Sequence, residues 1–248
     1  MAATTTAGAG SVFGILGGMG PLASAEFMKT IYECSGAVCA REQQAPRVVL
    51  YSDPTFPDRT ESFLGGGGEV VRRKLVDSLE RLCDSGAARI VICCMTIHYL
   101  VPSLPRALRE RVVSLPDVIL ARLEEGGRRH LMVCSSGTRK LEIFERHERW
   151  PRAQEFVVFP EEDEQRRLHE LIYEVKQNRG LREAGSFVES MLARHGLDAF
   201  AAGCSEIHLL AKRMAAAADA GEGRTKYSCL DPLAIIARQL AEQSVYEA

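Results

Sequence analysis

The chain has 248 residues, with 31 Lys or Arg against 33 Asp or Glu, which gives a formal net charge of −2 and an isoelectric point near 6.3. This near-balance argues against a protein that binds nucleic acid or an anionic membrane, because phosphate binding needs a surplus of cations. The hydrophobic share of 46% and the charged share of 26% are typical of a globular protein, and the length allows one large domain or two small ones.

The N-terminal segment and the cysteines indicate the compartment. Residues 1–11 lack the basic and apolar regions of a secretory signal and are expected to form a flexible tail. The longest apolar stretch, from Ile90 to Val101, is far shorter than the roughly 20 residues of a membrane helix. None of the eight cysteines stands in a C-x-x-C motif. We therefore expect a cytoplasmic protein with reduced cysteines.

Short β-rich runs alternate with helical segments along the chain. The expected strands are Val12–Leu16, Arg47–Tyr51, Arg89–Cys93, Val112–Leu115, His130–Cys134, Phe156–Phe159, Ala199–Ala202 and Tyr227–Leu230. The expected helices are Pro21–Glu33, Val70–Ser85, Pro105–Arg111, Thr138–Arg149, Glu162–Asn178, Gly185–His195 and Pro232–Tyr246. This alternation predicts parallel sheets with helices on both faces, which bind ligands at the carboxyl ends of their strands. The runs EEDEQRR and ARLEEGGRRH are interpreted as solvated helix and loop faces, and MAAAADAGEGR as a flexible surface loop.

A glycine-rich loop, LGGMGP, follows the first expected strand. Gly18, Gly20 and Ala23 match the dinucleotide fingerprint G-x-G-x-x-[G/A]. The acidic residue of that fingerprint is expected about 20 positions later, whereas Asp53 lies some 30 positions on, inside a proline-rich loop. The backbone N–H groups around Met19 can cradle a carboxylate as well as a phosphate. The alternative is a tight turn without a ligand.

A second loop, SDPTFPDRTESF, follows the second expected strand. Its two prolines keep it extended and rigid. Arg59 stands at the start of a helical turn, where its guanidinium can bind a carboxylate through two parallel hydrogen bonds. The alternative is a surface arginine paired with Asp58 or Glu61. The run Gly65–Gly68 lacks the Gly-Lys-Ser/Thr ending of a phosphate loop and is interpreted as a flexible segment near the sheet edge.

Two stretches of the chain repeat one another. Residues 82–100 read LCDSGAARIVICCMTIHYL, and residues 192–210 read LARHGLDAFAAGCSEIHLL. Aligned on Cys94 and Cys204, the segments CMTIHYL and CSEIHLL share Cys, Ile, His and Leu. The match indicates two related α/β halves, with chance and shared α/β patterning as the alternative. Each cysteine precedes an expected helix N-terminus, whose N–H groups and dipole favour the thiolate.

Two such thiols suit general acid–base catalysis. If both face one cleft, one as thiolate and one as thiol, the pair can remove a proton from one face of a carbon and return one to the other. The alternative is a pair of buried structural cysteines. Thr96, Thr138 and Ser205 are either helix caps or donors to a bound carboxylate. His98 and His208 are either ion-pair partners of the thiols or satisfied core histidines, and a zinc site would lack a third clustered ligand.

Taken in order, these motifs resemble the cofactor-independent aspartate/glutamate racemase family, and in particular its aspartate racemase branch, from Gly14 to about Gln239. GILGGMGP resembles the opening loop of that branch, and FPDRT its arginine loop. CCMTIH resembles the first cysteine motif, SSGT the Gly-Thr turn, AGCSEI the second cysteine motif, and LDPLAI the segment that returns to the first half. Met95 stands where the family usually has Asn, and His208 where it usually has Pro. The first departure leaves the identity of the substrate open.

The resemblance implies two pseudo-symmetric parallel-sheet α/β domains with the active site in the cleft between them. Residues 12–117 and 228–248 would form the domain that carries Cys94, and residues 118–227 the domain that carries Cys204. Both cysteines would be catalytic, with neither pyridoxal phosphate nor a metal. The substrate-binding residues that it implies are Met19, Arg59, Thr96, Thr138, Lys176, Ser205 and Glu206. Arg59 would bind the side-chain carboxylate, and Lys176 would be a second cation unless it pairs with Glu174 or solvent.

The sequence thus predicts a homodimeric enzyme that interconverts L- and D-aspartate, with glutamate as the alternative acid. Its expected partner is a small-molecule amino acid, and no cofactor is expected. A racemase or cis–trans isomerase of another small carboxylic acid is a second hypothesis. A non-catalytic regulator that binds an amino acid or a nucleotide is a third.

Overall fold

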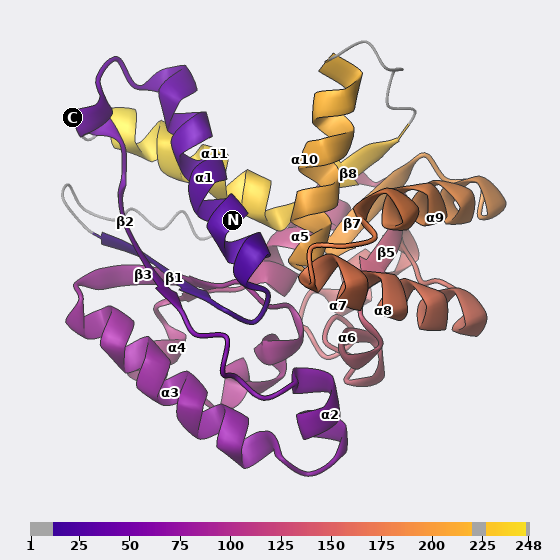
Figure 1. Cartoon of the computed structure of the whole chain (residues 1–248), viewed down its shortest axis with the longest axis horizontal. Coiled ribbons are helices and arrows are strands. Elements are labelled where there is room, and N and C mark those ends of the chain that lie inside the picture. The colour runs from indigo at the N-terminus through magenta and orange to yellow at the C-terminus, as the bar shows by residue number, and fades with distance from the viewer. Residues whose placement is uncertain (1–11, 220–226, 247–248) are drawn as a thin grey trace. The chain divides into compact units, whose positions relative to one another are not determined.

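The computed structural model describes residues 12–219 and 227–246, which fall into two compact units (Figure 1). The first unit comprises the chain up to Leu115 together with the segment from Leu233 onward, and the second comprises Pro116–Pro232. Each unit contains one four-stranded sheet in which all pairings are parallel. The predicted fold class, parallel α/β in two parts, is therefore confirmed.

In the first unit, four strands pair in the order β2-β1-β3-β4. They are β1 (Val12–Gly17), β2 (Arg47–Ser52), β3 (Ala87–Ile92) and β4 (Val112–Val113). The helices are α1 (Pro21–Val38), α2 (Arg59–Leu64), α3 (Gly68–Asp84), α4 (Arg106–Arg109) and α11 (Pro232–Tyr246), with 3-10 segments η1 (Glu42–Gln44) and η2 (Thr96–Ser103). Helices α1 and α11 cover one face of this sheet and α3 covers the other (Figure 1).

In the second unit, the strand order is β6-β5-β7-β8. The strands are β5 (His130–Cys134), β6 (Val157–Val158), β7 (Ala199–Gly203) and β8 (Ser228–Leu230). The helices are α5 (Leu115–Gly126), α6 (Ser136–Lys140), α7 (Trp150–Ala153), α8 (Glu162–Lys176), α9 (Leu181–Arg194) and α10 (Glu206–Asp219), with the 3-10 segment η3 (Gln154–Phe156).

The two sheets have the same topology. Strands β1, β2, β3 and β4 occupy the same places as β5, β6, β7 and β8. In each sheet the chain first moves outward to one side and then crosses back, so the switch of direction falls between β1 and β3 and between β5 and β7. Ligands of open α/β sheets bind beyond the carboxyl ends of the strands at such a switch point. The topology therefore marks two equivalent edges, one in each unit.

Each sheet buries one apolar side of a helix against alternate strand residues. On α3, the residues that face the sheet recur at helical spacing, and they pack against Ile90 and Ile92 of β3. They are Val71, Leu75, Leu79 and Leu82. In the second unit, Leu131 and Val133 of β5 join a core that also contains residues of α8, α9 and α10. These cores fix the strands whose ends carry the polar turns.

The helix predictions fail where helical spacing alone was the guide. The expected helix over 138–149 ends at Lys140, and the chain then turns through Glu142, whose φ is +54°. Helix α5 covers the first part of the run ARLEEGGRRH, which was interpreted as a solvated helix and loop face without bounds for a helix. Helix α10 extends to Asp219 through the first part of MAAAADAGEGR, which was predicted to be a loop, because α10 packs on β7. Residues 220–224 of that run lie outside the described residues.

The second crossover between the units falls later than expected. Ser228, Cys229 and Leu230 pair with β7, so β8 belongs to the second sheet. The chain returns to the first unit at the start of α11, rather than before β8.

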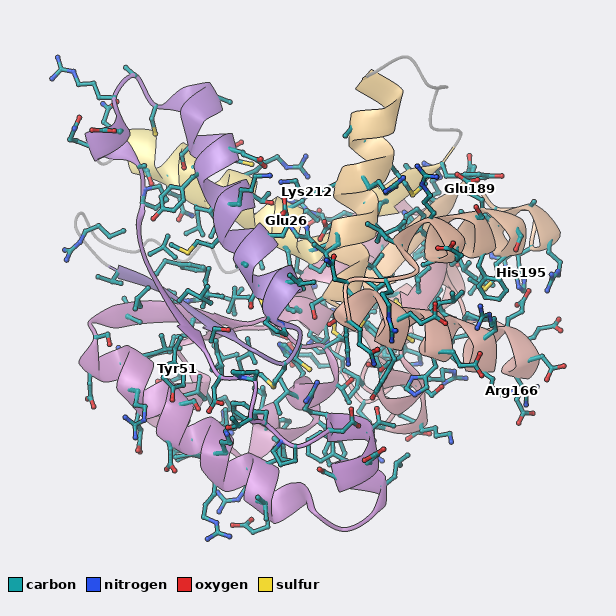
Figure 2. All side chains as sticks on the ribbon, in the orientation of Figure 1. Glu26, Tyr51, Arg166, Glu189, His195 and Lys212 are labelled. Atoms are coloured by element: carbon teal, nitrogen blue, oxygen red, sulfur yellow. The ribbon has the colours of Figure 1, made fainter. Side chains whose placement is uncertain are left out.

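The charged run EEDEQRR at the start of α8 is only partly a solvated face. Arg166 of α8 and Glu189 of α9 are exposed, as Figure 2 shows. Glu164, however, is buried, and its carboxylate accepts hydrogen bonds from Arg194 and from His195 Nε2, the latter at 2.8 Å.

Residues 1–11, which were expected to form a flexible tail, lie outside the described ranges. Among the described residues, no helix combines the length and hydrophobicity needed to cross a membrane.

A substitution of Gly18 is expected to lower the stability of the fold strongly. Its φ is +89°, and a Cβ built there would lie 2.2 Å from the backbone of Asp53. Gly18→Ala should therefore lower the free energy of unfolding by at least about 2 kcal/mol, measured by urea denaturation. The matched control is Gly36→Ala on the exposed face of α1, where nothing lies within 4 Å. There alanine should leave stability unchanged or raise it by about 1 kcal/mol. Equal stability of the two variants would contradict this reading of the loop.

Candidate active site

Cys94 lies in a tight turn just beyond β3. Its backbone N–H donates to the Ile92 carbonyl at 2.7 Å, and its side chain is only 6% exposed. The segment that follows is the 3-10 helix η2, which contains Pro102, rather than the α-helix that was predicted. A 3-10 segment aligns its N–H groups less well than an α-helix. Thr96 and Met95 are buried in the same turn.

His98 ties this turn to a distant part of the first unit. The Leu115 backbone N–H donates to Nε2 of His98 at 3.2 Å. Because Nε2 accepts, Nδ1 carries the proton and donates to the Cys94 carbonyl at 2.9 Å. His98 is thus a satisfied buried histidine, as one of the two interpretations proposed.

Cys204 follows β7 directly and precedes the α-helix α10, as predicted. Gly203 is required there, since a Cβ would lie 2.8 Å from Cys134 Cβ on the neighbouring strand. The Cys204 thiol donates to Glu206 Oε2 at 2.8 Å, and the Ser205 hydroxyl donates to the same oxygen at 3.2 Å. Glu206 is 1% exposed, and its other oxygen, Oε1, is buried without a hydrogen-bond partner among the described residues. The structure therefore brings a thiol, a hydroxyl and a carboxylate together.

The loops after β1 and β2 are joined by Arg59. Its side chain is 8% exposed, so it is not the surface arginine of the alternative interpretation. Nη2 donates to the Met19 carbonyl and Nη1 to the Pro57 carbonyl, both at 2.9 Å. Asp58 caps α2 by accepting from the Glu61 N–H at 2.9 Å. A buried cation is thereby held at the carboxyl edge of the first sheet.

Gly18 of the first loop serves protein packing. Gly18 faces the Asp53 backbone, and the Asp53 side chain binds Lys74 Nζ at 2.9 Å and the Thr55 hydroxyl at 2.6 Å. In a dinucleotide-binding fold the acidic residue would bind ribose. These contacts explain the glycine at position 18 without a nucleotide.

The turn after β5 is equivalent to the glycine loop. Ser135, rather than Thr138, caps the short helix α6, because its hydroxyl accepts from the Thr138 N–H at 3.2 Å. Thr138 is fully buried, and its hydroxyl lies 3.2 Å from that of Ser135. Cys134 pairs with Gly203 across the sheet, so this turn and Cys204 lie at neighbouring strand ends.

Gln165 of α8 is a residue of this edge that the sequence reasoning missed. Its Nε2 donates to the Cys134 carbonyl at 2.8 Å, and its Oε1 is buried without a hydrogen-bond partner among the described residues. Its place inside a charged run gave no signal of burial. Lys176 ends the same helix, so at about 1.5 Å per residue it lies roughly 16 Å along α8 from Gln165. Its Nζ stacks 4.3 Å from the Tyr173 ring centroid, and the structure does not bring it to the Thr138 turn.

Two thiols outside the repeat, those of the buried Cys134 and the partly buried Cys229, have raised pKa values. Burial raises the pKa of Cys134 to about 12, and burial together with Asp231 raises the pKa of Cys229 well above its ordinary value. These thiols keep their protons. All eight cysteines are free, and no cluster of three metal-ligating side chains occurs within 12–219 and 227–246.

The pKa of Cys134 has a consequence for stability at alkaline pH. In the unfolded chain a thiol ionises near pH 8.5, whereas the folded protein holds this proton until about pH 12. The contribution of this thiol is intact below about pH 8.5 and is lost as the pH rises toward 12. Between pH 8 and pH 10, the free energy of unfolding of Cys134→Ala should therefore fall by about 2 kcal/mol less than that of the parent protein, as measured by urea denaturation. Parallel pH profiles of the two proteins would contradict this.

The protein is thus an α/β protein made of two topologically equivalent units. In each unit a cysteine lies just beyond the strand that stands third in the sheet order. The model of the Asp/Glu/hydantoin racemase family matches residues 16–240, and the chain belongs to this family. Its fold is similar to that of an aspartate racemase from Picrophilus torridus, with 21% identity, a TM-score of 0.75, and coverage of 96% of this chain and 100% of that one. It is also similar to an aspartate racemase homologue from Pyrococcus horikoshii OT3, with 20% identity, a TM-score of 0.65, and coverage of 95% and 99%. Family membership supports racemase activity.

Proposed function

We propose that this protein interconverts the enantiomers of aspartate without pyridoxal phosphate, using Cys94 and Cys204 as two acid–base groups. The observation that carries the proposal is the equivalence of the two thiols. Cys94 follows β3 and Cys204 follows β7, and these strands occupy the same place in two sheets of identical topology. Both thiols lie beside a switch point, where ligands of such sheets bind. The proposal requires that the two thiols reach opposite faces of one substrate carbon.

The reaction is a pair of proton transfers. The thiolate of one cysteine takes the Cα proton and becomes a thiol, and the electron pair left on Cα delocalises into the α-carboxylate. The thiol of the other cysteine then donates its proton to the opposite face of Cα and becomes a thiolate. Protons and charge balance over the turnover, and the enzyme ends with its two thiol states exchanged. The reverse reaction starts from that state.

Glu206 supports the second thiol in two ways. Its Oε2 already accepts the Cys204 S–H at 2.8 Å, so transfer of that proton to the carboxylate generates the thiolate, and the Cys204–Glu206 pair keeps a single negative charge before and after the transfer. Its Oε1 is a buried acceptor that receives no hydrogen bond among the described residues. A buried acceptor left unsatisfied costs about 1–3 kcal/mol, and the substrate α-ammonium would satisfy it. Glu206 would thus bind the substrate and set the protonation state of Cys204.

The turns at the sheet edges would hold the substrate carboxylates. The hydroxyls of Thr96 and Thr138 would donate to the α-carboxylate, where charge develops as the proton leaves, and Ser205 would do so by exchanging its hydrogen bond to Glu206 Oε2 for one to the substrate. Arg59 would bind the side-chain carboxylate bidentately, since its buried guanidinium is held rigidly at the edge of the first sheet. Met19 would contribute through its loop, which Arg59 anchors. Lys176, at the end of α8, would supply a second cation.

Arg59→Lys should test the selection of a dicarboxylate. Lysine keeps the charge but loses the planar fork, so the KM for aspartate should rise about 10- to 100-fold, with a smaller effect on kcat. Turnover of each aspartate enantiomer, followed by chiral chromatography, measures both constants. Gly36→Ala on α1 serves as a folding control. An unchanged KM would show that Arg59 only braces the Met19 loop.

The proposed function is tested by proton NMR of L-aspartate, and separately L-glutamate, in deuterated buffer with the purified, reduced protein and no added pyridoxal phosphate. We expect loss of the α-proton signal together with the appearance of the D-enantiomer on chiral analysis. Absence of exchange with both acids would overturn the proposed substrate class. The expected homodimer is checked separately by analytical ultracentrifugation.

A second candidate rests on Met95. This side chain is 1% exposed and directly follows Cys94, so the first thiol has an apolar neighbour where the family usually has an amide. An apolar neighbour favours a substrate with less polar character beside that thiol. The same exchange experiment with a panel of other amino acids and small unsaturated dicarboxylates distinguishes another racemase or a cis–trans isomerase from the aspartate enzyme.

A further inference from the structure

Two buried histidines occupy equivalent places in the repeat and have no part in the proton transfers. His98 comes four residues after Cys94, and His208 comes four residues after Cys204. Their exposed fractions are 6% and 0%. A fully buried imidazole is costly unless its nitrogens are hydrogen-bonded, so the partners of these rings indicate what they do.

Each histidine binds a residue at a crossover of the chain. Nε2 of His98 accepts from the N–H of Leu115, which is the last residue of the first unit and the first residue of α5. Nδ1 of His208 donates to Asp231 Oδ2 at 2.6 Å. Asp231 directly precedes Pro232, after which the chain returns to the first unit. Each hydrogen bond joins residues of one unit: His98 and Leu115 belong to the first unit, and His208 and Asp231 to the second.

We propose that His98 and His208 are positioning residues, each of which fixes one crossover segment to the cysteine turn of its own unit. The inference rests on the proposed two-thiol reaction. The first turn needs such a tie most, because Cys94 is followed by a 3-10 segment instead of an α-helix. His98 spans from the Cys94 carbonyl to the Leu115 amide, so displacement of the crossover displaces the backbone that carries the thiol. In the second unit, His208 lies in the first turns of α10, whose first residue is Glu206, the acceptor of the Cys204 thiol.

The function of these two histidine hydrogen bonds follows from where the chain crosses between the units. The chain crosses twice between the two units, and a residue at each crossing is hydrogen-bonded to a histidine of the repeat. Proton transfer requires donor and acceptor within about 3–3.5 Å, and an error of about 1 Å costs roughly 100-fold in rate. Fixing each crossover to its thiol turn holds the thiol within that tolerance.

The test uses His98→Asn and His208→Asn. Asparagine places an amide near Nδ1, so His98→Asn keeps a donor for the Cys94 carbonyl and loses the acceptor for Leu115. In both variants kcat should fall about 10- to 100-fold, with KM changed less than about threefold. His98→Gln, which offers an acceptor near the place of Nε2, should recover part of the loss and covers the case in which the asparagine variant does not fold.

The diagnostic readout is the kinetic isotope effect with α-deuterated L- and D-aspartate. Each thiol deprotonates one enantiomer and reprotonates the other. Misplacing Cys94 should therefore raise the isotope effect on kcat/KM for one enantiomer and lower it for the other, and misplacing Cys204 should do the opposite. A merely structural loss of folded protein lowers both rates and leaves both isotope effects unchanged. The matched control is His195→Asn, which breaks another histidine–carboxylate pair, with Glu164 at 2.8 Å, and should leave both isotope effects unchanged.

Failure of the inference and failure of the proposed function give different results. If the parent racemises aspartate and neither histidine variant shows opposite isotope effects, the positioning role is overturned and the racemase stands. If the parent racemises nothing, the proposed function is overturned. The inference is then decided by two other measurements, the rate at which iodoacetamide alkylates Cys94 and the hydrogen exchange rate of the Leu115 amide. Faster exchange at Leu115 and an altered alkylation rate in His98→Asn support the tie, and unchanged rates overturn it.

Discussion

Replacing either Cys94 or Cys204 by alanine should reduce racemisation of both aspartate enantiomers by at least about 1000-fold, because each turnover needs one thiol as base and the other as acid. The loss should be the same in both directions, since the equilibrium constant of a racemisation is unity. Chiral chromatography of timed reactions from each enantiomer measures the rates. The matched control is Cys93→Ala, which removes a fully buried thiol from the residue next to Cys94 and should keep most of the activity.

The same variants assign the two thiols. A protein that lacks one cysteine still has a base for one enantiomer, so it should exchange the α-proton of that enantiomer with solvent deuterium without inverting it. Cys94→Ala and Cys204→Ala should therefore exchange opposite enantiomers. Full racemisation by either variant would exclude the two-base scheme, and exchange of the same enantiomer by both would exclude equivalent roles for the thiols.

Much of the fold could be predicted because each sheet is built from short apolar runs that only a buried strand accommodates. The runs at β1, β3, β5 and β7 are continuous and lie between helical segments, a pattern that parallel sheets require. The cysteine turns could be placed for the same reason, since each directly follows such a run. The identical strand orders of the two sheets agree with the repeat around Cys94 and Cys204.

What could not be predicted depends on contacts between distant residues. The burial of Arg59 follows from the Met19 carbonyl, which lies 40 positions away in the chain. The burial of Gln165 follows from the Cys134 carbonyl, and nothing in a charged run distinguishes the one residue that faces a strand end. The segment η2 contains Pro102, and His98 holds its turn by donating to the Cys94 carbonyl and accepting from the Leu115 N–H, the first residue of α5. The local sequence indicates helix or strand propensity and the period of the apolar residues, whereas tertiary packing determines these hydrogen-bond partners.

Glu206→Gln should lower kcat about 100- to 1000-fold while the protein stays folded. Glutamine fills the same space, but a neutral amide is a far weaker base than a carboxylate and cannot take the Cys204 proton. It also removes the charge that would hold the substrate α-ammonium, so the KM should rise as well. The control is Glu189→Gln on the exposed face of α9, which makes the same charge change in the same unit and should leave both constants unchanged.

The pH dependence separates the two roles of Glu206. If the carboxylate accepts the thiol proton, raising the pH should recover part of the kcat of Glu206→Gln, because hydroxide then replaces the carboxylate as proton acceptor. The KM should not recover, since the charge opposite the ammonium is still missing. Because Cys204 and Ser205 both donate to Oε2, and Oε1 is buried without a partner among the described residues, one carboxylate can serve thiol and substrate together. A variant with full kcat and a raised KM would leave Glu206 as a substrate ligand only, and Cys204 would then depend on the α10 N-terminus for its thiolate.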